Sequence, residues 1–169
     1  VGVLIVLVAA LFAPLLAPFD PSYVNPADRL SEPSATYWFG TDDLGRDIYS
    51  RVLYGARISL LVGIVVMVAA TAIGSLLGLI AGFYSKIDTP LMRVMDGLEA
   101  FPSILLAIAI MAAFEPAVEN VIFALSFVYI PNIVRLVRGT TVMNSRVLYV
   151  ESAMVAGQSD WGIMWKYIL

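Results

Sequence analysis

The sequence contains no cysteine and no histidine, and only 14% of its 169 residues are charged. The two missing residue types exclude disulfide frameworks, thiolate and imidazole metal sites, and any nucleophile of the Ser-His or Cys-His kind. Hydrophobic residues make up 60% of the chain, and the mean hydropathy is +0.89. Soluble domains are about 45–50% apolar and about 25% charged. A chain this apolar cannot cover its surface with polar groups, so we expect lipid to be its solvent.

Several other features are missing. The net charge is only −3, which offers no basic face for nucleic acid, so no nucleic-acid partner is expected. The sequence has no G-x-x-x-x-G-K-[ST] loop, so it cannot bind ATP phosphates in that way, and no cofactor is expected. The first residue is Val1 rather than Met, and Leu169 ends an apolar helical run. We therefore interpret the chain as a fragment of a longer protein.

Four apolar runs are candidates for membrane-spanning helices, since a bilayer core about 30 Å thick needs roughly 20 apolar residues. They are residues 1–19 (a truncated first span), 58–82, 100–114 and about 120–137, the last being uncharged as far as residue 134. The first run lacks the basic region and the cleavage site of a signal peptide. The acidic stretch EPAVE at 115–119 predicts a tight turn between two antiparallel helices. The sequence therefore predicts an all-α, multi-pass membrane protein with four visible spans.

The basic residues indicate how these spans cross the membrane. Residues 20–57 and 115–119 face one side, and residues 83–99 and 135–169 face the other. The first side carries Arg29, Arg46, Arg51 and Arg57, and the second carries Lys86, Arg93, Arg135, Arg138, Arg146 and Lys166. Because basic residues are enriched in cytoplasmic loops, this six-to-four distribution favours a cytoplasmic C-terminal segment, but composition alone leaves the topology open. The uncharged cores of the spans disfavour an ion-coupled carrier, which usually needs ionisable groups in its bundle.

The segment 146–169 is polar enough to lie outside the bilayer. Residues 149–156 are good helix formers, with Glu151 near the start, where a negative charge suits the helix dipole. Gly157 then favours a left-handed helix end, and Ser159 or Asp160 can cap a second helix. We predict a helical hairpin on the cytoplasmic side. From these residues alone, a hairpin that merely rests on the membrane is the commoner explanation.

The loop 20–57 precedes the clearest span. Thr41 is a candidate cap for a helix whose first turn carries Asp42 and Asp43. The spacing of Ile48, Tyr49 and Val52 predicts a short amphipathic helix at the outer membrane surface. This loop could be a structural lid or could contact substrate or a binding protein. Two adjacent carboxylates without further ligands do not make a metal site, so no metal is expected.

Two features inside the spans bear on packing. Gly74, Gly78 and Gly82 form a small-residue stripe on one helix face, which permits close approach of another helix. That helix belongs either to this subunit, the default interpretation, or to a second subunit. Pro131 lies inside the last span and interrupts a backbone hydrogen bond. It is either an ordinary kink or a gating hinge.

The C-terminal stretch ESAMVAGQSDWGIMWKYIL resembles the signature loop of ABC-importer permeases. That pattern reads E-A-A, three residues, Gly, then roughly nine residues before I-x-L-P. Glu151, Ser152 and Ala153 occupy the E-A-A positions, and Gly157 occupies the glycine position. Serine in place of the second alanine is a change between small residues.

A second block strengthens this resemblance. The stretch WFGTDDLGRDIYSRVLYGARISLLVG is similar to the G-T-D-x-x-G-R-D stretch of permeases for dipeptides, oligopeptides and nickel. The matching residues of this extracytoplasmic motif are Gly40, Thr41, Asp42, Gly45, Arg46 and Asp47. The stretch DGLEAFPSILLAI, residues 96–108, also resembles this family's entry to its third span. The resemblance runs nearly continuously over residues 1–169.

The resemblance implies a transmembrane subunit of an ATP-driven importer in a prokaryotic inner membrane. About six spans are expected in the full chain, of which four are visible here. The implied partners are a second homologous permease, two ATP-binding cassette subunits and an extracytoplasmic solute-binding protein. The hairpin is implied to couple ATP hydrolysis in the cassette subunits to transport, so this subunit is not itself expected to be an enzyme. Peptides, a related small solute or nickel are the implied substrates.

Two other classes of function stay open at this stage. The first is a non-transporting membrane scaffold or assembly protein that carries an interfacial hairpin. The second is an integral-membrane enzyme, which is disfavoured because no catalytic group lies within the spans.

Overall fold

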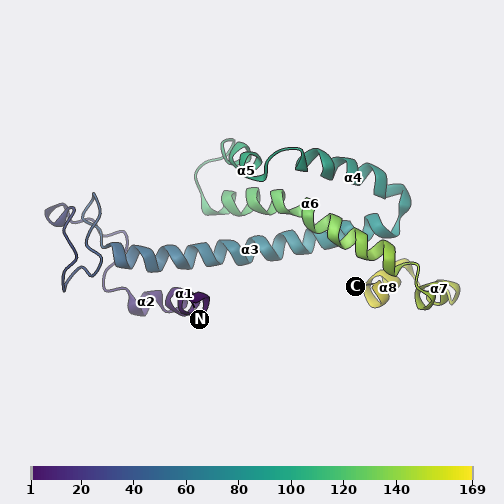
Figure 1. Cartoon of the computed structure of the whole chain (residues 1–169), viewed down its shortest axis with the longest axis horizontal. Helices are drawn as coiled ribbons and strands as arrows, with labels where there is room; N and C mark the ends of the chain where they lie inside the picture. The colour runs from purple at the N-terminus through teal and green to yellow at the C-terminus, as the bar shows by residue number, and fades with distance from the viewer. Residues whose placement is uncertain (1, 169) are drawn as a thin grey trace. The chain divides into compact units, whose positions relative to one another are not determined.

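The computed structural model describes residues 2–168, and its regular elements in that range are helices. The predicted all-α fold class is therefore confirmed. The chain divides into two compact units, residues 1–64 and 65–169. Figure 1 labels the helices, of which one, α3, begins in the first unit and ends in the second. The elements are α1 (Gly2–Leu11), α2 (Ala13–Leu16), a 3₁₀ turn (Pro26–Asp28), α3 (Ile48–Phe83), α4 (Ser85–Glu99), α5 (Ser103–Met111), α6 (Val118–Asn144), α7 (Leu148–Val155), α8 (Asp160–Ile163) and a π-helical turn (Met164–Ile168).

Two helices are long and apolar enough to cross a membrane by themselves. These are α3, which contains the predicted span 58–82, and α6, which contains the predicted span 120–137. The 36 residues of α3 exceed the roughly 20 that a bilayer core requires. Both helices therefore extend beyond the hydrocarbon layer.

The predicted span 100–114 takes a different form. Its apolar residues fold into the nine-residue helix α5, which meets α4 at an angle of 86° across a short break. Pro102 lies in that break, and a proline disfavours helical geometry at the residue before it. Together α4 and α5 are long and apolar enough to form one bent or re-entrant span. By length and composition, residues 2–168 therefore contain two spanning helices, or three if this bent pair is one span, and the predicted truncated span 1–19 is not among them.

The N-terminal run 1–19 also differs from a single long helix. It folds as α1 and then α2, which has Pro14 in its first turn. Proline lacks the N–H that an uninterrupted helix requires, so a new helix starts where the first one ends. Neither piece has the length of a spanning helix.

The start of α3 corrects the prediction for residues 41–57. Thr41 does not cap a helix. It forms an isolated bridge with Asp47, and the helix begins at Ile48. The Asp47 carboxylate accepts a hydrogen bond of 2.8 Å from the backbone N–H of Ser50, which makes Asp47 the N-cap. The amphipathic residues after Ile48 thus form the first turns of the spanning helix rather than a separate surface helix.

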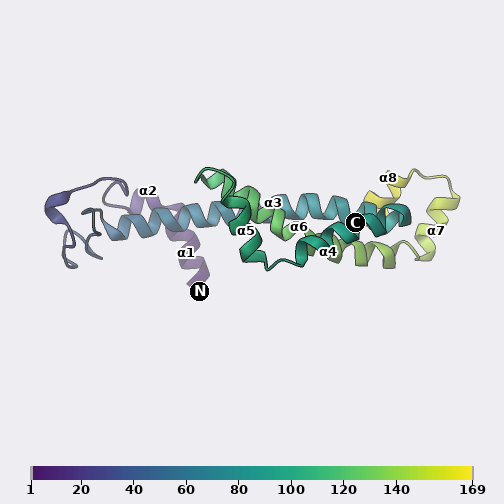
Figure 2. The ribbon, with the colours of Figure 1, turned by 90° about the horizontal axis from the view of Figure 1, so that it is seen from above.

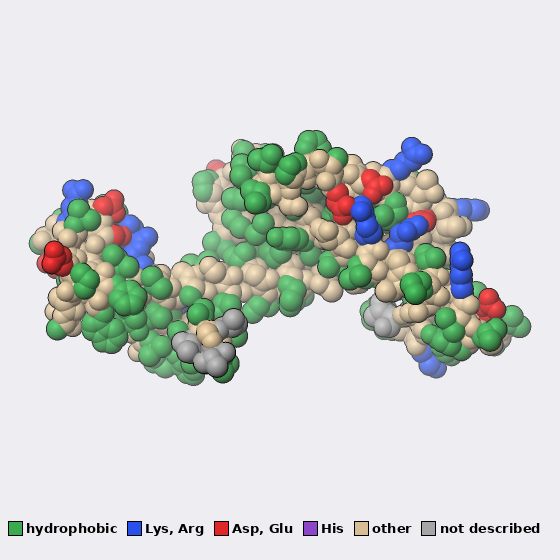
Figure 3. Space-filling view, viewed as in Figure 1, with side chains coloured by type: hydrophobic (Ala, Val, Ile, Leu, Met, Phe, Trp, Pro, Cys, Tyr) green, Lys and Arg blue, Asp and Glu red, His purple; other side chains and the backbone are tan. Residues whose placement is uncertain are grey.

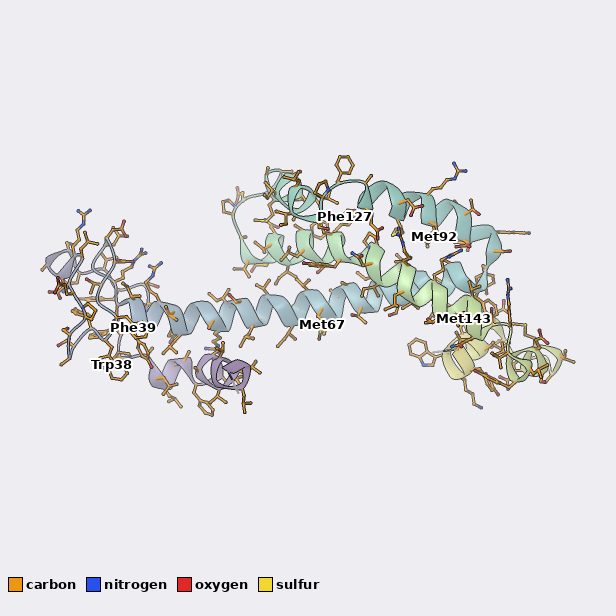
Figure 4. The ribbon with its side chains drawn as sticks, viewed as in Figure 1. Trp38, Phe39, Met67, Met92, Phe127 and Met143 are labelled. Atoms are coloured by element: carbon orange, nitrogen blue, oxygen red, sulfur yellow. The ribbon has the colours of Figure 1, made fainter. Side chains whose placement is uncertain are left out.

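Aromatic side chains pack beside this helix start. The ring centroids of Trp38 and Tyr49 are 4.9 Å apart, and those of Phe39 and Tyr49 are 5.3 Å apart. Figure 4 shows Trp38 and Phe39 near the beginning of α3. Ser50 is fully buried, and its hydroxyl accepts a hydrogen bond of 3.2 Å from the backbone N–H of Phe19. These contacts connect the end of the N-terminal helices to α3 within the first unit.

The second unit is organised around α6. In both views α4 runs alongside the C-terminal half of α6, while α5 lies beside the N-terminal half. Helices α7 and α8 follow at the far end of α6 (Figures 1 and 2). The unit therefore presents a helical hairpin at the end of its longest complete helix.

Candidate functional site

The candidate site is the hairpin of residues 146–169, called the coupling hairpin after the role that the sequence resemblance implies; the structure describes it up to residue 168. Its first helix, α7, ends in a Schellman motif. The backbone N–H of Gln158 donates to the carbonyl of Ala153 over 3.2 Å, and that of Gly157 donates to Met154 over 3.0 Å. Gly157 has φ of +78°, a left-handed conformation that side-chain-bearing residues rarely adopt. The chain thus reverses at the glycine on which the sequence pattern depends.

The second helix of the hairpin begins immediately after this turn. The Ser159 hydroxyl accepts a hydrogen bond of 3.3 Å from the backbone N–H of Gly162, as an N-cap does. Asp160 follows in the first turn and accepts a hydrogen bond of 2.8 Å from the phenol of Tyr84. This bond to Asp160 raises the pKa of Tyr84, because the carboxylate favours the protonated phenol. Tyr84 directly follows α3, so this bond attaches the hairpin to the end of that helix.

One face of the hairpin is buried. Val150 and Ile163 are fully inaccessible, and they form a cluster with Leu79 near the end of α3. Val137 of α6 packs against the same cluster. Burying a side chain of this size contributes about 1.5–3 kcal/mol, so the cluster fixes the hairpin to α3 and α6.

The opposite face of the hairpin is exposed and largely apolar. Val155 is 90% exposed, Trp165 is 67% exposed and Trp161 is 56% exposed. Glu151 and Ser152, from the E-A-A positions, are also exposed, whereas Ala153 is buried. Figure 3 shows hydrophobic side chains on the surface at this end of the second unit. An exposed apolar patch with polar neighbours is typical of a surface that binds another protein or a membrane.

The glycine stripe lies against α6. A Cβ atom at Gly74 would be 2.6 Å from Ile133, and one at Gly78 would be 2.8 Å from the carbonyl oxygen of Val134. A Cβ atom at Gly82 would be 2.6 Å from the side chain of Thr141. Distances this short leave no room for a side chain. The structure thus places the stripe in a helix contact within this chain.

The extracytoplasmic motif forms a compact turn before α3. Gly40 and Gly45 both have positive φ, and a Cβ atom at Gly45 would lie 1.8 Å from the carbonyl oxygen of Asn25. The hydroxyl of Thr41 accepts a hydrogen bond of 2.8 Å from the backbone N–H of Ser31 and donates one to the backbone carbonyl of Asp28. The motif therefore folds the loop back on itself.

Asp42 is the electrostatic centre of this turn. Its carboxylate accepts hydrogen bonds from the backbone N–H groups of Leu44 and Arg46 and from the Nε of Arg46. Burial opposes ionisation of the carboxyl group, but these hydrogen bonds and the Arg46 charge outweigh it and lower the pKa of Asp42 to about 2. Within residues 2–168, no group of three or more acidic side chains is placed to hold a metal ion.

Comparison with known proteins agrees with this geometry. A family described as the binding-protein-dependent transport system inner membrane component matches residues 74–169, a range that includes the whole hairpin. The chain belongs to this family. We refer to its members as inner membrane components.

Individual relatives extend the similarity over almost the whole chain. A putative peptide transport system permease protein of Brucella suis is 44% identical over 98% of this chain. A glutathione transport system permease protein of Pectobacterium atrosepticum is 44% identical over 99% of this chain. A dipeptide transport system permease protein of Alkalihalophilus pseudofirmus is 43% identical over 100% of this chain. The alignments cover 56–57% of these relatives, so the chain spans about half their length.

The structure of this inner membrane component also contains ion pairs that the sequence patterns did not reveal. Arg138 of α6 forms a two-pronged contact with Asp88 of α4, one arm of which measures 2.6 Å. Arg135 contacts Asp96 at 2.8 Å and Glu99 at 2.5 Å. Figure 3 shows acidic and basic side chains side by side over α4 and the second half of α6. The partners lie 36–50 residues apart in the sequence, so local spacing carries no signal for them.

Pro131 of this inner membrane component is buried inside α6, and the helix continues through it. Figure 1 shows α6 changing direction near its middle. This is what a proline without an N–H donor produces in a helix that neighbouring helices hold in place. A gating role for Pro131 stays a prediction.

Proposed function

We propose that this chain is the membrane-spanning part of a permease subunit in an ATP-driven importer of peptides or a related small solute. The family membership and the names of the relatives, which include peptide, dipeptide and glutathione systems, support this proposal. A second permease would complete the pathway, a binding protein would deliver the solute, and two cassette subunits would hydrolyse ATP. The chain itself supplies the pathway and the coupling element rather than a catalytic group.

The observation that carries the proposal is the two-faced coupling hairpin. Its inner face is held to α3 and α6 by Leu79, Val150 and Ile163, and its outer face exposes Val155 and Trp161. An element attached so firmly on one side moves as a rigid body together with the ends of those helices. The exposed side offers an apolar surface that a groove of a cassette subunit could cover.

Force transmission follows from this attachment. When ATP draws two cassette subunits together, hairpins seated in their grooves move with them. Because the Gly157 turn fixes the angle between α7 and α8, the hairpin conveys the displacement to α3 and α6 instead of deforming. The ion pairs of Arg135 and Arg138 with residues of α4 then transfer the displacement to that helix. The outcome is a rearrangement of the spans between inward-facing and outward-facing states.

Reconstitution of the full-length permease with its partner subunits tests this proposal. The key variant is Val155→Asp, which places a charge at the most exposed apolar position of the hairpin. The matched control is Gln158→Asp, which adds the same charge three residues after the end of α7. We expect Val155→Asp to reduce both co-purification of the cassette subunits and ATP-dependent peptide uptake, while the control retains both. Uptake that does not require ATP or the cassette subunits would instead favour a different class of membrane protein.

A further inference from the structure

The first unit contains an open cleft of about 660 Å³ at the start of α3. Arg51, Tyr54, Gly55 and Ile58 line it from one face of that helix, at the spacing of successive helical turns. Arg46 of the extracytoplasmic motif and Asp20 complete its charged lining. The cleft is distinct from the coupling hairpin, and neither the family description nor the relatives' names assign a function to it.

The two arginines of the cleft are held in place by a single carboxylate. The Nε of Arg46 lies 2.7 Å from Oδ2 of Asp42, and a terminal nitrogen of Arg51 lies 3.3 Å from the same oxygen. A guanidinium has five N–H donors, and in the described part of the chain these contacts use one nitrogen of each arginine. The remaining donors are positioned and charged, which is the arrangement that binds a phosphate or carboxylate in two-pronged fashion.

The opposite charge lies in the same cleft. Asp20 is exposed, and its Oδ1 accepts a hydrogen bond of 2.7 Å from the backbone N–H of Ser22, which fixes its position. With Asp42 already neutralised by contact with the arginines, Arg46 and Arg51 provide one net positive charge and Asp20 provides one negative charge. The cleft thus complements a ligand that carries an oxyanion and an ammonium group a few atoms apart.

The apolar surroundings indicate where such a ligand comes from. Ile58 lines the cleft, and Leu61 continues the same face of α3 beyond it; both are more than half exposed. Trp38 and Phe39, also more than half exposed, lie at the same end of the helix (Figure 4). Exposed tryptophan and tyrosine rings are typical of the headgroup level of a membrane. These rings predict that the cleft lies near the level of the lipid headgroups, with an aliphatic surface leading away from it.

We propose that this cleft is a binding site for a phospholipid with an ethanolamine headgroup. Arg46 and Arg51 bind the phosphate, Asp20 binds the primary ammonium, and an acyl chain lies along Ile58 and Leu61. Gly55 leaves the space for the headgroup, since a Cβ atom there has no neighbour within 4 Å. The proposal depends on the membrane location of the chain and not on the solute that the transporter carries.

Lipid titration followed by native mass spectrometry of the full chain in detergent tests this site. The probes are dioleoylphosphatidylethanolamine and dioleoylphosphatidylcholine, which share the phosphate, although only the first has ammonium hydrogens. We expect the ethanolamine lipid to bind more tightly and Asp20→Asn to remove that preference. Arg51→Gln should weaken binding of both lipids at least about tenfold, the factor that corresponds to about 1.4 kcal/mol.

A second pair of variants keeps the test independent of loop stability, because Arg51 also contacts Asp42. Gly55→Leu fills the cleft without removing a charge, and Gly63→Leu makes the same change two helical turns further on, where a Cβ atom is equally free. Only Gly55→Leu should weaken lipid binding. Equal binding by these two variants would overturn the proposal. Displacement of the lipid by dialanine but not by phosphoethanolamine would also overturn it, and would assign the cleft to a peptide.

Discussion

The turn at Gly157 offers the sharpest test of force transmission. The residue has φ of +78°, and a Cβ atom placed on it would meet nothing within 4 Å. Any effect of substitution therefore comes from backbone strain and not from a clash with a neighbour. Holding a side-chain-bearing residue in this conformation costs about 1–2 kcal/mol, and a β-branched residue is the least tolerant of it.

Gly157→Val should therefore reduce the population of the native turn by a factor of about 5–30. If the turn opens instead, the two backbone hydrogen bonds from Gly157 and Gln158 are lost, at about 1 kcal/mol each. The spans do not involve this turn, so the subunit should still insert and express. Uptake should fall, and the cassette subunits should either bind poorly or hydrolyse ATP without transport.

Two matched variants make this result specific. Gly157→Asn should behave nearly like the parent protein, because asparagine tolerates the left-handed conformation best after glycine. Gly139→Val makes the same chemical change in α6, where φ is not positive and a Cβ atom is also free of neighbours. The assay measures cassette co-purification, hydrolysis and uptake in one reconstituted preparation. Normal coupled uptake by Gly157→Val would show that the Gly157 turn is not needed for force transmission.

Three further predictions concern other parts of the molecule. In intact cells an impermeant maleimide should label Asp43→Cys and not Gln158→Cys, since the loop is predicted outside and the hairpin inside; the reverse pattern would invert the topology. Gly78→Leu should lower the detergent stability of the chain by more than Gly63→Leu, because only the first places atoms within 2.8 Å of α6; equal stabilities would contradict the described contact. The carboxyl of Asp42 should titrate at about pH 2 in a carbon NMR experiment. This pKa is depressed below the ordinary value of about 3.9. Ionised Asp42 therefore stabilises the turn fully above about pH 3.9, and this stabilisation is lost as the pH falls toward 2. Titration near pH 4 would show that the hydrogen bonds to Asp42 do not form.

The sequence predicted the features that depend on local residue patterns. The uncharged run 58–82 identified the core of α3, because 25 consecutive residues without charge leave a bilayer as the favoured solvent. The turn at Gly157 and the cap at Ser159 followed from the preferences of glycine and serine for those backbone positions. In each case the deciding interactions lie within a few residues of each other.

The features that escaped prediction depend on contacts between distant residues. Thr41 was expected to cap a helix, but its hydroxyl bonds to the loop residue Ser31, and Asp42 binds its own turn. Asp47 therefore becomes the cap, six residues later than predicted. The ion pair of Arg138 with Asp88 links two helices that no local pattern places side by side. Likewise, the bend between α4 and α5 divides a run whose composition alone resembles a straight span.

The proposed function requires the coupling hairpin to dock into a nucleotide-binding partner. Photo-crosslinking tests it most directly, with a photoreactive amino acid at Val155 in one sample and at Met67 of α3 in another. Both positions are more than half exposed, but Met67 lies within the spanning region. We expect a crosslink from position 155 to the cassette subunit in the assembled transporter, and none from position 67. Crosslinks from position 155 to lipid alone, with the cassette subunits bound, would contradict it.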